Sequence, residues 1–323
     1  MKKVLITGIA GFAGSHLAEY ILENHKDAEI FGTILENERL DNISHIQKQL
    51  RLIPCDINDA SMVSSAMEKV LPDTIFHLAA QSYIHSSWED SGATLKTNII
   101  GQSNFFEAVR KKLDAISPTI LITCSSEEYG YVRQNETPIQ ETNDLRPRSP
   151  YAVSKIAQDY MGYQYWEAYK MKVIRMRAFN HTGPRRAPIF FVSSLAKKVA
   201  ELERGMSTEP FKTRDLSAVR DFSDVRDIVK GYAMAVASCS PGDVYNICSG
   251  KGLVLREIVD TFIKLSKAKN MKLVRTEEGT RPTDGGVVIG DHSKFFRATG
   301  WKPNIDFLGK TIPDMLDWWR KHL

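Results

Sequence analysis

The sequence predicts an α/β protein with a doubly wound parallel sheet and a smaller mixed α/β domain at the C-terminal end. Three observations support this fold class. Short, almost continuous apolar runs alternate with segments of helical spacing through the first half of the chain. The first run ends in a glycine-rich turn that opens a helix, and the alternation loosens after residue 180. Apolar strands separated by helices are typical of a parallel sheet that helices cover on both faces.

Each half of the chain has its own expected elements. Strands are expected at 3–7, 29–34, 50–54, 73–79, 119–124 and 171–179, with helical patterns at 16–24, 60–70, 95–113 and 151–170. Residues 1–179 are therefore predicted to form the first domain, to which a strand near 243–248 returns. Residues 180–323 are predicted to form the second domain, with helices at 255–267 and 306–323, the latter interrupted by Pro313.

The composition excludes several classes of protein. The chain has 323 residues, of which 42% are hydrophobic and 25% charged, as in ordinary soluble globular proteins. The net charge is +4 and no dense Lys/Arg run occurs, so neither nucleic acid nor a membrane surface is an expected partner. No run of 18 apolar residues predicts a transmembrane helix, and the N-terminal apolar stretch is interpreted as a strand and turn rather than a signal peptide. Four cysteines without a CxxC motif predict reduced thiols in a cytoplasmic protein.

A phosphate-binding turn is expected at residues 8–14, which read GIAGFAG. Glycines in a strand–turn–helix setting permit a tight turn, and the free N–H groups of the helix N-terminus can then bind a pyrophosphate. This pattern predicts a Rossmann-type domain that binds NAD(P). The turn residues expected to contact the cofactor are Gly8, Gly11, Phe12, Ala13 and Gly14.

The choice between the two nicotinamide cofactors depends on the end of the second strand. NAD sites usually carry an acid there, which accepts a hydrogen bond from the ribose 2′-hydroxyl. The strand ends in Thr33-Ile34-Leu35, with Glu36 nearby, and Arg39 can reach a 2′-phosphate. NADPH is therefore favoured and NADH is allowed. The alternative is that Arg39 is a solvated loop residue.

Further cofactor contacts are expected after the third and fourth strands. Asp56, followed by Ile57, can accept a hydrogen bond from the adenine amino group, or it can cap the next helix. The segment HLAAQSY (77–83) has small residues that let a cofactor lie against the backbone, so the predicted contacts are Leu78, Ala79, Ala80, Gln81 and Tyr83. Asn98 in the following helix can support main-chain groups or order a water if it is buried, and has little meaning if it is exposed.

The candidate acid–base pair lies in SPYAVSK (149–155), where Tyr151 and Lys155 are four residues apart. Residues i and i+4 share one face of a helix. A free tyrosine titrates near 10, and a neighbouring cation lowers that pKa. Taken alone, the YxxxK pattern also occurs as a chance surface pair.

Eight motifs in order resemble the extended short-chain dehydrogenase/reductase family, in its nucleotide-sugar branch. They are GIAGFAG, HLAAQSY, CSSEEYG (124–130), SPYAVSK, RAFNHTGP (177–184), RDFSDVRD (220–227), YNICSG (245–250) and GTRPTD (279–284). The resemblance implies that Tyr151 is the acid–base, Lys155 its activator, and Ser125 the third member of the triad. It also implies a homodimer formed through the helices near 95–113 and 151–170.

The same resemblance implies residues that bind a sugar nucleotide. Ser126 and Glu127 would line the sugar pocket, Asn180 would touch the sugar diphosphate, and Arg220 and Arg281 would meet the diphosphate or nucleotide. Guanidinium groups suit phosphate oxygens because they donate two parallel hydrogen bonds. Further candidates are Arg185, Arg186, Val192, Lys198, Arg214 and Asp284.

Three reactions remain open on this scaffold. The motifs look most like those of reductases that convert GDP-4-dehydro-6-deoxy-D-mannose to GDP-6-deoxy-D-mannose (GDP-D-rhamnose). Glu127 occupies the base position of GDP-mannose 4,6-dehydratases, which keeps dehydration as the alternative, and a nucleotide-sugar 4-epimerase is a more distant one. Glu128 is expected to point to the opposite face of a continuing strand, away from the chemistry.

Overall fold

The computed structural model describes residues 1–213, 215–268, 273–276 and 286–323. Its centre is a seven-stranded sheet in the order β3-β2-β1-β4-β5-β6-β10, and every neighbouring pair is parallel. The strands are β1 (Lys3–Thr7), β2 (Glu29–Ile34), β3 (Leu50–Pro54), β4 (Thr74–His77), β5 (Thr119–Ser125), β6 (Lys172–Ala178) and β10 (Val244–Ile247). The order of the first six strands is that of a doubly wound dinucleotide-binding fold, so the predicted fold class is confirmed.

Helices cover both faces of this sheet, because alternate residues of each buried strand are apolar on opposite sides. Val4 and Ile6 of β1 belong to a core on one face, whereas Leu5 belongs to the core on the other face. The first core includes α1 (Phe12–Asn24) and α8 (Val225–Ser238), and the second includes α2 (Ala60–Val70) and α5 (Gly101–Arg110). The remaining helices of the first half are α3 (Ile84–Glu89), α4 (Ser91–Leu95) and α6 (Pro150–Tyr169).

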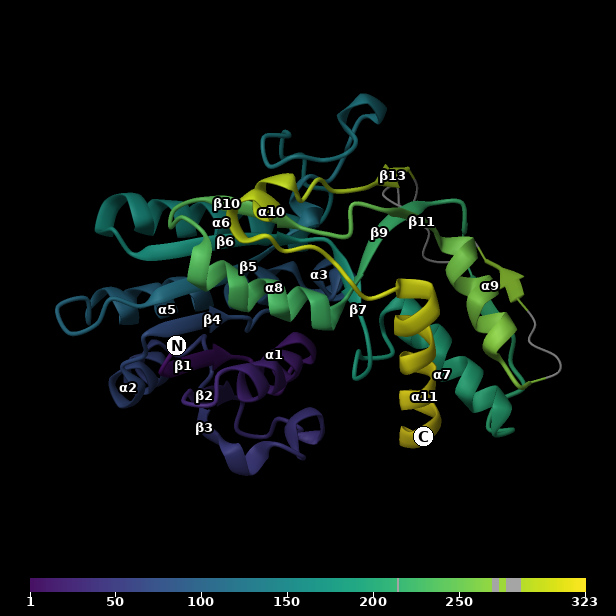
Figure 1. The fold of residues 1–323 in the computed structure, drawn as a ribbon, viewed down its shortest axis with the longest axis horizontal. Coiled ribbons are helices and arrows are strands. Elements are labelled where there is room, and N and C mark those ends of the chain that lie inside the picture. The colour runs from purple at the N-terminus through teal and green to yellow at the C-terminus, as the bar shows by residue number, and fades with distance from the viewer. Residues whose placement is uncertain (214, 269–272, 277–285) are drawn as a thin grey trace.

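A second, smaller unit lies beside the sheet (Figure 1). Its helices α7 (Phe191–Glu203), α9 (Leu255–Leu265) and α11 (Ile312–His322) share a separate apolar core. Two small sheets complete it: one contains β7, β9, β11 and β13, and the other pairs β8 with β12. Their bounds are β7 (Asn180–Thr182), β8 (Phe211–Thr213), β9 (Val219–Asp224), β11 (Gly252–Val254), β12 (Leu273–Arg275) and β13 (Val287–Val288).

The second half of the chain returns elements to the large sheet. The strand predicted near 243–248 corresponds to β10, which pairs with β6. Phe295 of α10 (Ser293–Thr299) and several residues of α8 belong to the core of the first half. The predicted domain boundary between residues 179 and 180 remains a prediction, because elements on both sides of it pack in one core.

Three expected elements differ in detail. The helix expected at 95–113 contains a π-helical turn, Lys96–Ile100, and α5 ends at Arg110. The segment expected at 306–323 begins as a π-helical turn, Phe307–Thr311, and becomes the α-helix α11 at Ile312, so the type of helix changes one residue before Pro313. The strand β5 ends at Ser125, and residues Ser126–Glu128 form a 3-10 helix.

The cysteines and the helices bear on two further expectations, reduced thiols and the lack of a transmembrane helix. All four cysteines are buried and free of disulfides, as predicted. None of the helices that these residues form combines the length and apolar character needed to cross a bilayer.

Candidate active site

A cavity of about 1000 Å³ opens at the carboxyl ends of the central strands. Its walls include residues of the turn after β1, the end of β5 and the start of α6. Arg220 and Phe222 of β9 line it from the second half of the chain. Ligand sites of doubly wound sheets lie at this edge, where the strand order reverses. The cavity is therefore the candidate active site.

The phosphate turn has the geometry that a pyrophosphate requires. All five predicted turn residues line the cavity. Gly8 has a φ of +68°, and a Cβ on Gly14 would lie 2.4 Å from the Gly8 carbonyl oxygen, so larger residues do not fit. Gly11 is the N-cap of α1 and supplies no side-chain hydrogen bond, which leaves the first N–H groups of the helix available to an anion. The residues present thus fit a dinucleotide.

The opposite wall is held by hydrogen bonds to main-chain groups. Thr7 Oγ1 accepts from the N–H groups of Leu78 and Ala79, each at 3.0 Å. All five residues predicted in the 77–83 segment line the cavity. Asn98 is fully buried; its Oδ1 accepts from Gln81 N–H at 2.8 Å and its Nδ2 donates to the Gln81 carbonyl. Asn98 therefore supports the main chain and does not line the cavity, which corrects the predicted cofactor contact.

The end of the cavity near β2 and β3 differs from expectation at one position. Asp56 and Ile57 line the cavity as predicted, and the cap of α2 is Asp59 rather than Asp56. Arg39 does not line the cavity: its side chain is 89% exposed and pairs with Asp41 at 2.6 Å. The position of Arg39 matches the solvated alternative rather than the predicted cofactor contact. Glu38 lines the cavity instead.

Three predicted catalytic side chains converge in the cavity. Ser125 ends β5, while Tyr151 and Lys155 lie one turn apart near the start of α6, whose N-cap Ser149 accepts from Ala152 N–H. Ser125 hydrogen bonds to the Tyr151 side chain. Lys155 Nζ donates to the Thr123 carbonyl at 2.8 Å and lies 5.9 Å from the centre of the Tyr151 ring. Both α6 residues are buried, so the pair is not a chance surface pattern.

The electrostatics keep Tyr151 protonated at neutral pH. Burial raises the pKa of Tyr151 above its usual value, and the nearby charge of Glu127 raises it further. The hydrogen bond from Ser125 and the charge of Arg186 act in the other direction. Burial also lowers the pKa of Lys155. Tyr151 is therefore a neutral phenol that can donate a proton.

The CSSEEYG segment divides its side chains between the cavity and the core. Ser126 and Glu127 line the cavity. Glu128 is fully buried, and its Oε1 accepts from Ser125 N–H at 2.8 Å, while Ser125 Oγ accepts from Glu127 N–H at 3.1 Å. Glu128 also pairs with Arg177 at 3.2 Å. The chain turns into a 3-10 helix after Ser125 instead of continuing as a strand, and Glu128 still lies outside the cavity, as expected.

Only some of the predicted substrate-binding residues line the cavity. Asn180, Val192 and Arg220 line the cavity. A neighbouring hollow of about 330 Å³ shares Ser126, Glu127, Asn180 and Arg220 with it. Lys198 does not line the cavity, because its Nζ donates to Ser207 Oγ at 2.6 Å, which corrects that prediction. Arg214, Arg281 and Asp284 lie outside the described residues.

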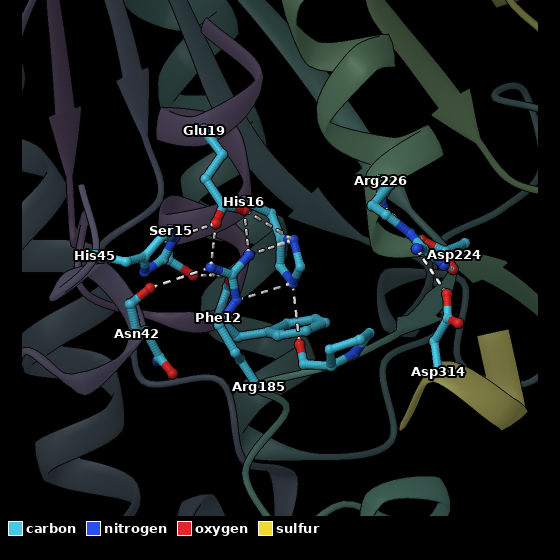
Figure 2. Close-up of polar contacts among 11 residues, drawn as sticks. Phe12, Ser15, His16, Glu19, Asn42, His45, Arg185, Asp224, Arg226 and Asp314 are labelled. Carbon is cyan, nitrogen blue, oxygen red and sulfur yellow. Dashed lines mark hydrogen bonds and ion pairs between the residues drawn. The ribbon is translucent and has the colours of Figure 1, made fainter. Parts of the chain in front are cut away.

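Two adjacent arginines point in different directions. Arg185 does not line the cavity; it binds Glu19 and His16 of α1, as Figure 2 shows. Arg186 lines the cavity, with its guanidinium carbon 4.7 Å from the centre of the Phe12 ring and 3.4 Å from that of Phe190. The φ of Arg185 is +73°, a left-handed conformation that separates the two side chains. The anion-binding prediction is thus corrected for Arg185.

Some cavity residues were not predicted from the sequence. His181 lines the cavity and stacks on Phe12, with 6.1 Å between ring centres. Burial lowers the pKa of His181 to about 4, so its imidazole is neutral at neutral pH. It follows Asn180 in the RAFNHTGP motif, which is the only sequence signal that points to it. Asn58 and Lys212 also line the cavity and carry no comparable signal.

Comparison with known proteins gives a consistent family. Residues 5–312 match the family model described as GDP-mannose 4,6 dehydratase. GDP-6-deoxy-D-mannose reductase of Pseudomonas aeruginosa is 28% identical over 98% of this chain and 97% of its own length. GDP-mannose 4,6 dehydratase of Drosophila melanogaster is 31% identical over 98% of this chain and 85% of its own length. The structure of RMD from Pseudomonas aeruginosa, solved in complex with NADPH, is 28% identical, with a TM-score of 0.85 and full coverage of both chains.

These matches confirm the predicted oxidoreductase class and the predicted nucleotide-sugar branch of the extended short-chain dehydrogenases/reductases. The family model spans nearly the whole chain, including the phosphate turn, the Tyr151–Lys155 helix and most of the second half. The chain belongs to the GDP-mannose 4,6-dehydratase family.

Proposed function

We propose that this protein reduces the C4 ketone of GDP-4-dehydro-6-deoxy-D-mannose to give GDP-6-deoxy-D-mannose (GDP-D-rhamnose), with NADPH or NADH as the reductant. The observation that carries the proposal is the buried, neutral Tyr151 hydroxyl beside Ser125. Reduction of a ketone needs a proton donor at the carbonyl oxygen, and this phenol is one. The likeness to the Pseudomonas reductase over almost the full length of both chains supports the same reaction.

The proposed chemistry assigns one task to each member of the triad. When bound, the dinucleotide supplies the hydride that adds to C4. Tyr151 donates its proton to the forming alkoxide, so ketone, hydride and proton together give the alcohol. Ser125 donates a hydrogen bond to the same oxygen and holds it beside Tyr151. Lys155, fixed by the Thr123 carbonyl, supplies the positive charge next to Tyr151 and holds the ribose.

The sugar diphosphate is proposed to lie toward the second half of the chain. Arg186, Lys212 and Arg220 are cations that line the cavity, and a diphosphate brings the negative charge that such groups bind. Asn180 lies between the cavity and the neighbouring hollow, where it can donate to a phosphate oxygen. The hollow provides space for the part of the ligand that extends beyond the sugar.

Dehydration of GDP-mannose is a second candidate because Glu127 lines the cavity close enough to Tyr151 to raise its pKa. Elimination of water needs such a base in addition to the triad. The dehydratase of Drosophila is also 31% identical to this chain. A 4-epimerase would need only the triad and a tightly held dinucleotide, and no additional observation favours it.

The test is to incubate the purified protein with two substrates separately. GDP-mannose is supplied without added reductant, and the 4-keto sugar nucleotide is supplied with NADPH or NADH. The proposal expects reductant oxidation only with the ketone, and formation of GDP-6-deoxy-D-mannose identified by mass spectrometry and NMR. Release of a 4-keto sugar from GDP-mannose alone would replace the reductase by the dehydratase.

A homodimer is also proposed. Five large apolar side chains are exposed on α6 and on the π-helical turn before α5: Ile100, Val153, Tyr160, Tyr163 and Tyr169. Exposed apolar groups gathered on neighbouring helices are typical of an interface. Sedimentation equilibrium tests this proposal: Tyr160→Glu should shift the protein toward the monomer, and a wild-type monomer at micromolar concentration would reject it.

A further inference from the structure

The cavity has an acidic side chain, and no basic one, at the end that adjoins β2. Thr33, Ile34, Leu35 and Glu38 line this end. The basic residues that line the cavity lie elsewhere: Lys155 is in α6, Arg186 follows β7, and Lys212 and Arg220 are in β8 and β9. In doubly wound sheets the adenosine ribose of a dinucleotide lies beside the end of the second strand. The charge found there therefore bears on the ribose 2′ position.

Glu38 is held in place by a short reciprocal turn. Its Oε2 accepts from Leu35 N–H at 3.0 Å, and its own N–H donates to the Leu35 carbonyl at 3.1 Å. The carboxylate thus folds back over the end of β2, where it is partly exposed. Its Oε1 accepts no hydrogen bond from the described residues and is available to a hydroxyl group in the cavity.

Two arginines near this part of the chain, Arg39 and Arg51, are turned away from this place. Arg39 is 89% exposed and pairs with Asp41. Arg51 lies over the Phe31 ring and pairs with Glu29, at the opposite end of β2. Neither lines the cavity. A 2′-phosphate bound here would meet the Glu38 carboxylate without a guanidinium to balance its charge.

We propose that Glu38 makes this protein selective for NADH over NADPH. The carboxylate accepts a hydrogen bond from the 2′-hydroxyl of NADH, and it repels the 2′-phosphate of NADPH. This inference rests on the proposed function, because it requires that the cavity bind a nicotinamide dinucleotide.

The test measures dissociation constants of NADH and NADPH separately, by calorimetry on the full-length protein without substrate. The wild type is expected to bind NADH about 10- to 100-fold more tightly, the range that a hydrogen bond to a charged group gives. Glu38→Gln should weaken NADH binding, strengthen NADPH binding and reduce the ratio at least about tenfold. Glu38→Arg should reverse the preference.

Two controls isolate the Glu38 carboxylate. Glu36→Gln removes the same charge two residues away, from an exposed side chain that does not line the cavity, and should leave the ratio unchanged. Arg39→Gln should not weaken NADPH binding. Circular dichroism and a thermal melt verify that each variant is folded.

The possible outcomes are distinct. A wild type that binds NADPH as tightly as NADH, or a ratio that Glu38→Gln leaves unchanged, overturns the inference and leaves the proposed reaction standing. Loss of NADPH binding in Arg39→Gln overturns it as well, because that arginine would then hold the 2′-phosphate. Binding of neither dinucleotide overturns both the inference and the proposed function.

Discussion

Arg185 and Glu19 form a two-pronged ion pair that ties the second half of the chain to the helix of the phosphate turn (Figure 2). Arg185 Nη1 lies 2.7 Å from Glu19 Oε1, and Nη2 lies 2.5 Å from Oε2. Arg185 also donates to the Asn42 carbonyl, and Asn42 Nδ2 donates to the Ala10 carbonyl inside the turn. The phosphate turn and the loop that carries Arg186 therefore depend on one another for their positions.

Replacing this arginine should weaken both the fold and dinucleotide binding. Arg185→Gln leaves the Glu19 carboxylate without its guanidinium, so we expect a loss of about 1–3 kcal/mol in the free energy of unfolding. Urea denaturation measures this loss, and the dissociation constant of NADH should rise in parallel. Arg256→Gln, which breaks an exposed pair with Asp260, is the matched control and should change stability by less than about 0.5 kcal/mol. Equal effects of the two substitutions would contradict the role of the pair.

The same cluster predicts how stability depends on pH. Burial, and next the charge of Arg185, lower the pKa of His16 from 6.5 to about 4. Its Nε2 donates to the Pro184 carbonyl at 3.0 Å, and its Nδ1 accepts from Arg185. Between pH 6.5 and 4 the unfolded chain binds a proton at this histidine that the folded chain does not bind, so stability falls as the pH falls through this window.

The contribution of His16 can be isolated. A shift from 6.5 to about 4 corresponds to about 3 kcal/mol for a buried group. His16→Gln should therefore show a smaller loss of stability between pH 7 and 4.5 than the wild type, measured by urea titrations at fixed pH. An unchanged pH dependence would show that His16 does not titrate differently in the folded and unfolded states.

Loss of the Tyr151 hydroxyl should remove the chemistry and spare binding. Tyr151→Phe keeps the buried ring but cannot donate a proton, so kcat should fall by about 10²–10⁴-fold. The dissociation constant of the dinucleotide should change little. Tyr160→Phe lies on the same helix, is exposed and does not line the cavity, so it should leave kcat unchanged. Normal turnover by Tyr151→Phe would exclude the proposed mechanism.

The first half of the fold follows closely from the sequence, because long apolar runs and glycine turns mark its elements locally. The predicted strands 3–7, 29–34 and 50–54 coincide with β1, β2 and β3. The second half is different: β11 and β13 have three and two residues, which is too short for any periodicity to show. Their positions depend on pairing with β9, a contact between segments distant in sequence.

Within the site, residues in motifs were predictable and the directions of loop side chains were not. Neighbouring arginines 185 and 186 separate because one residue has a positive φ. Glu38 rather than Arg39 faces the cavity because its carboxylate folds back to the Leu35 N–H. The strand β5 ends at Ser125 because a capping interaction between Ser125 and Glu128 starts a 3-10 helix. Each of these depends on backbone geometry that residue types alone do not specify.

Stability should change little when the buried Glu128 is replaced by glutamine, and should fall when it is replaced by alanine. Burial and the neighbouring Asp159 raise the pKa of Glu128, so its negative charge is costly in the fold and an uncharged amide is tolerated there. Glu128→Gln can still accept from Ser125 N–H, and Arg177 keeps its pair with Asp159, so a change within about 1 kcal/mol is expected. Glu128→Ala removes the contacts of Glu128 with Ser125 and with Arg177, and should lower the free energy of unfolding by about 2–4 kcal/mol. Equal losses in the two variants would mean that the negative charge itself is required.

The charge of Glu127 raises the pKa of Tyr151. Glu127→Gln removes that charge, so the phenol should lose its proton at a lower pH. Because ketone reduction needs the protonated phenol, the fall of kcat/KM on the alkaline side should move to lower pH in this variant. At neutral pH the variant should still reduce the ketone within about tenfold of the wild type, because the triad remains.

A matched substitution and a second assay decide what the Glu127 carboxylate does. Glu167→Gln removes an exposed charge from the same helix as Tyr151 and should leave the pH profile unchanged. If the alkaline limb of Glu127→Gln does not move, the carboxylate does not act on Tyr151 in solution. If the wild type dehydrates GDP-mannose and Glu127→Gln does not, Glu127 is a base and the protein is a dehydratase. A shifted alkaline limb without any dehydration assigns Glu127 to the electrostatics of a reductase, since its charge then tunes the proton donor without removing a proton from the sugar.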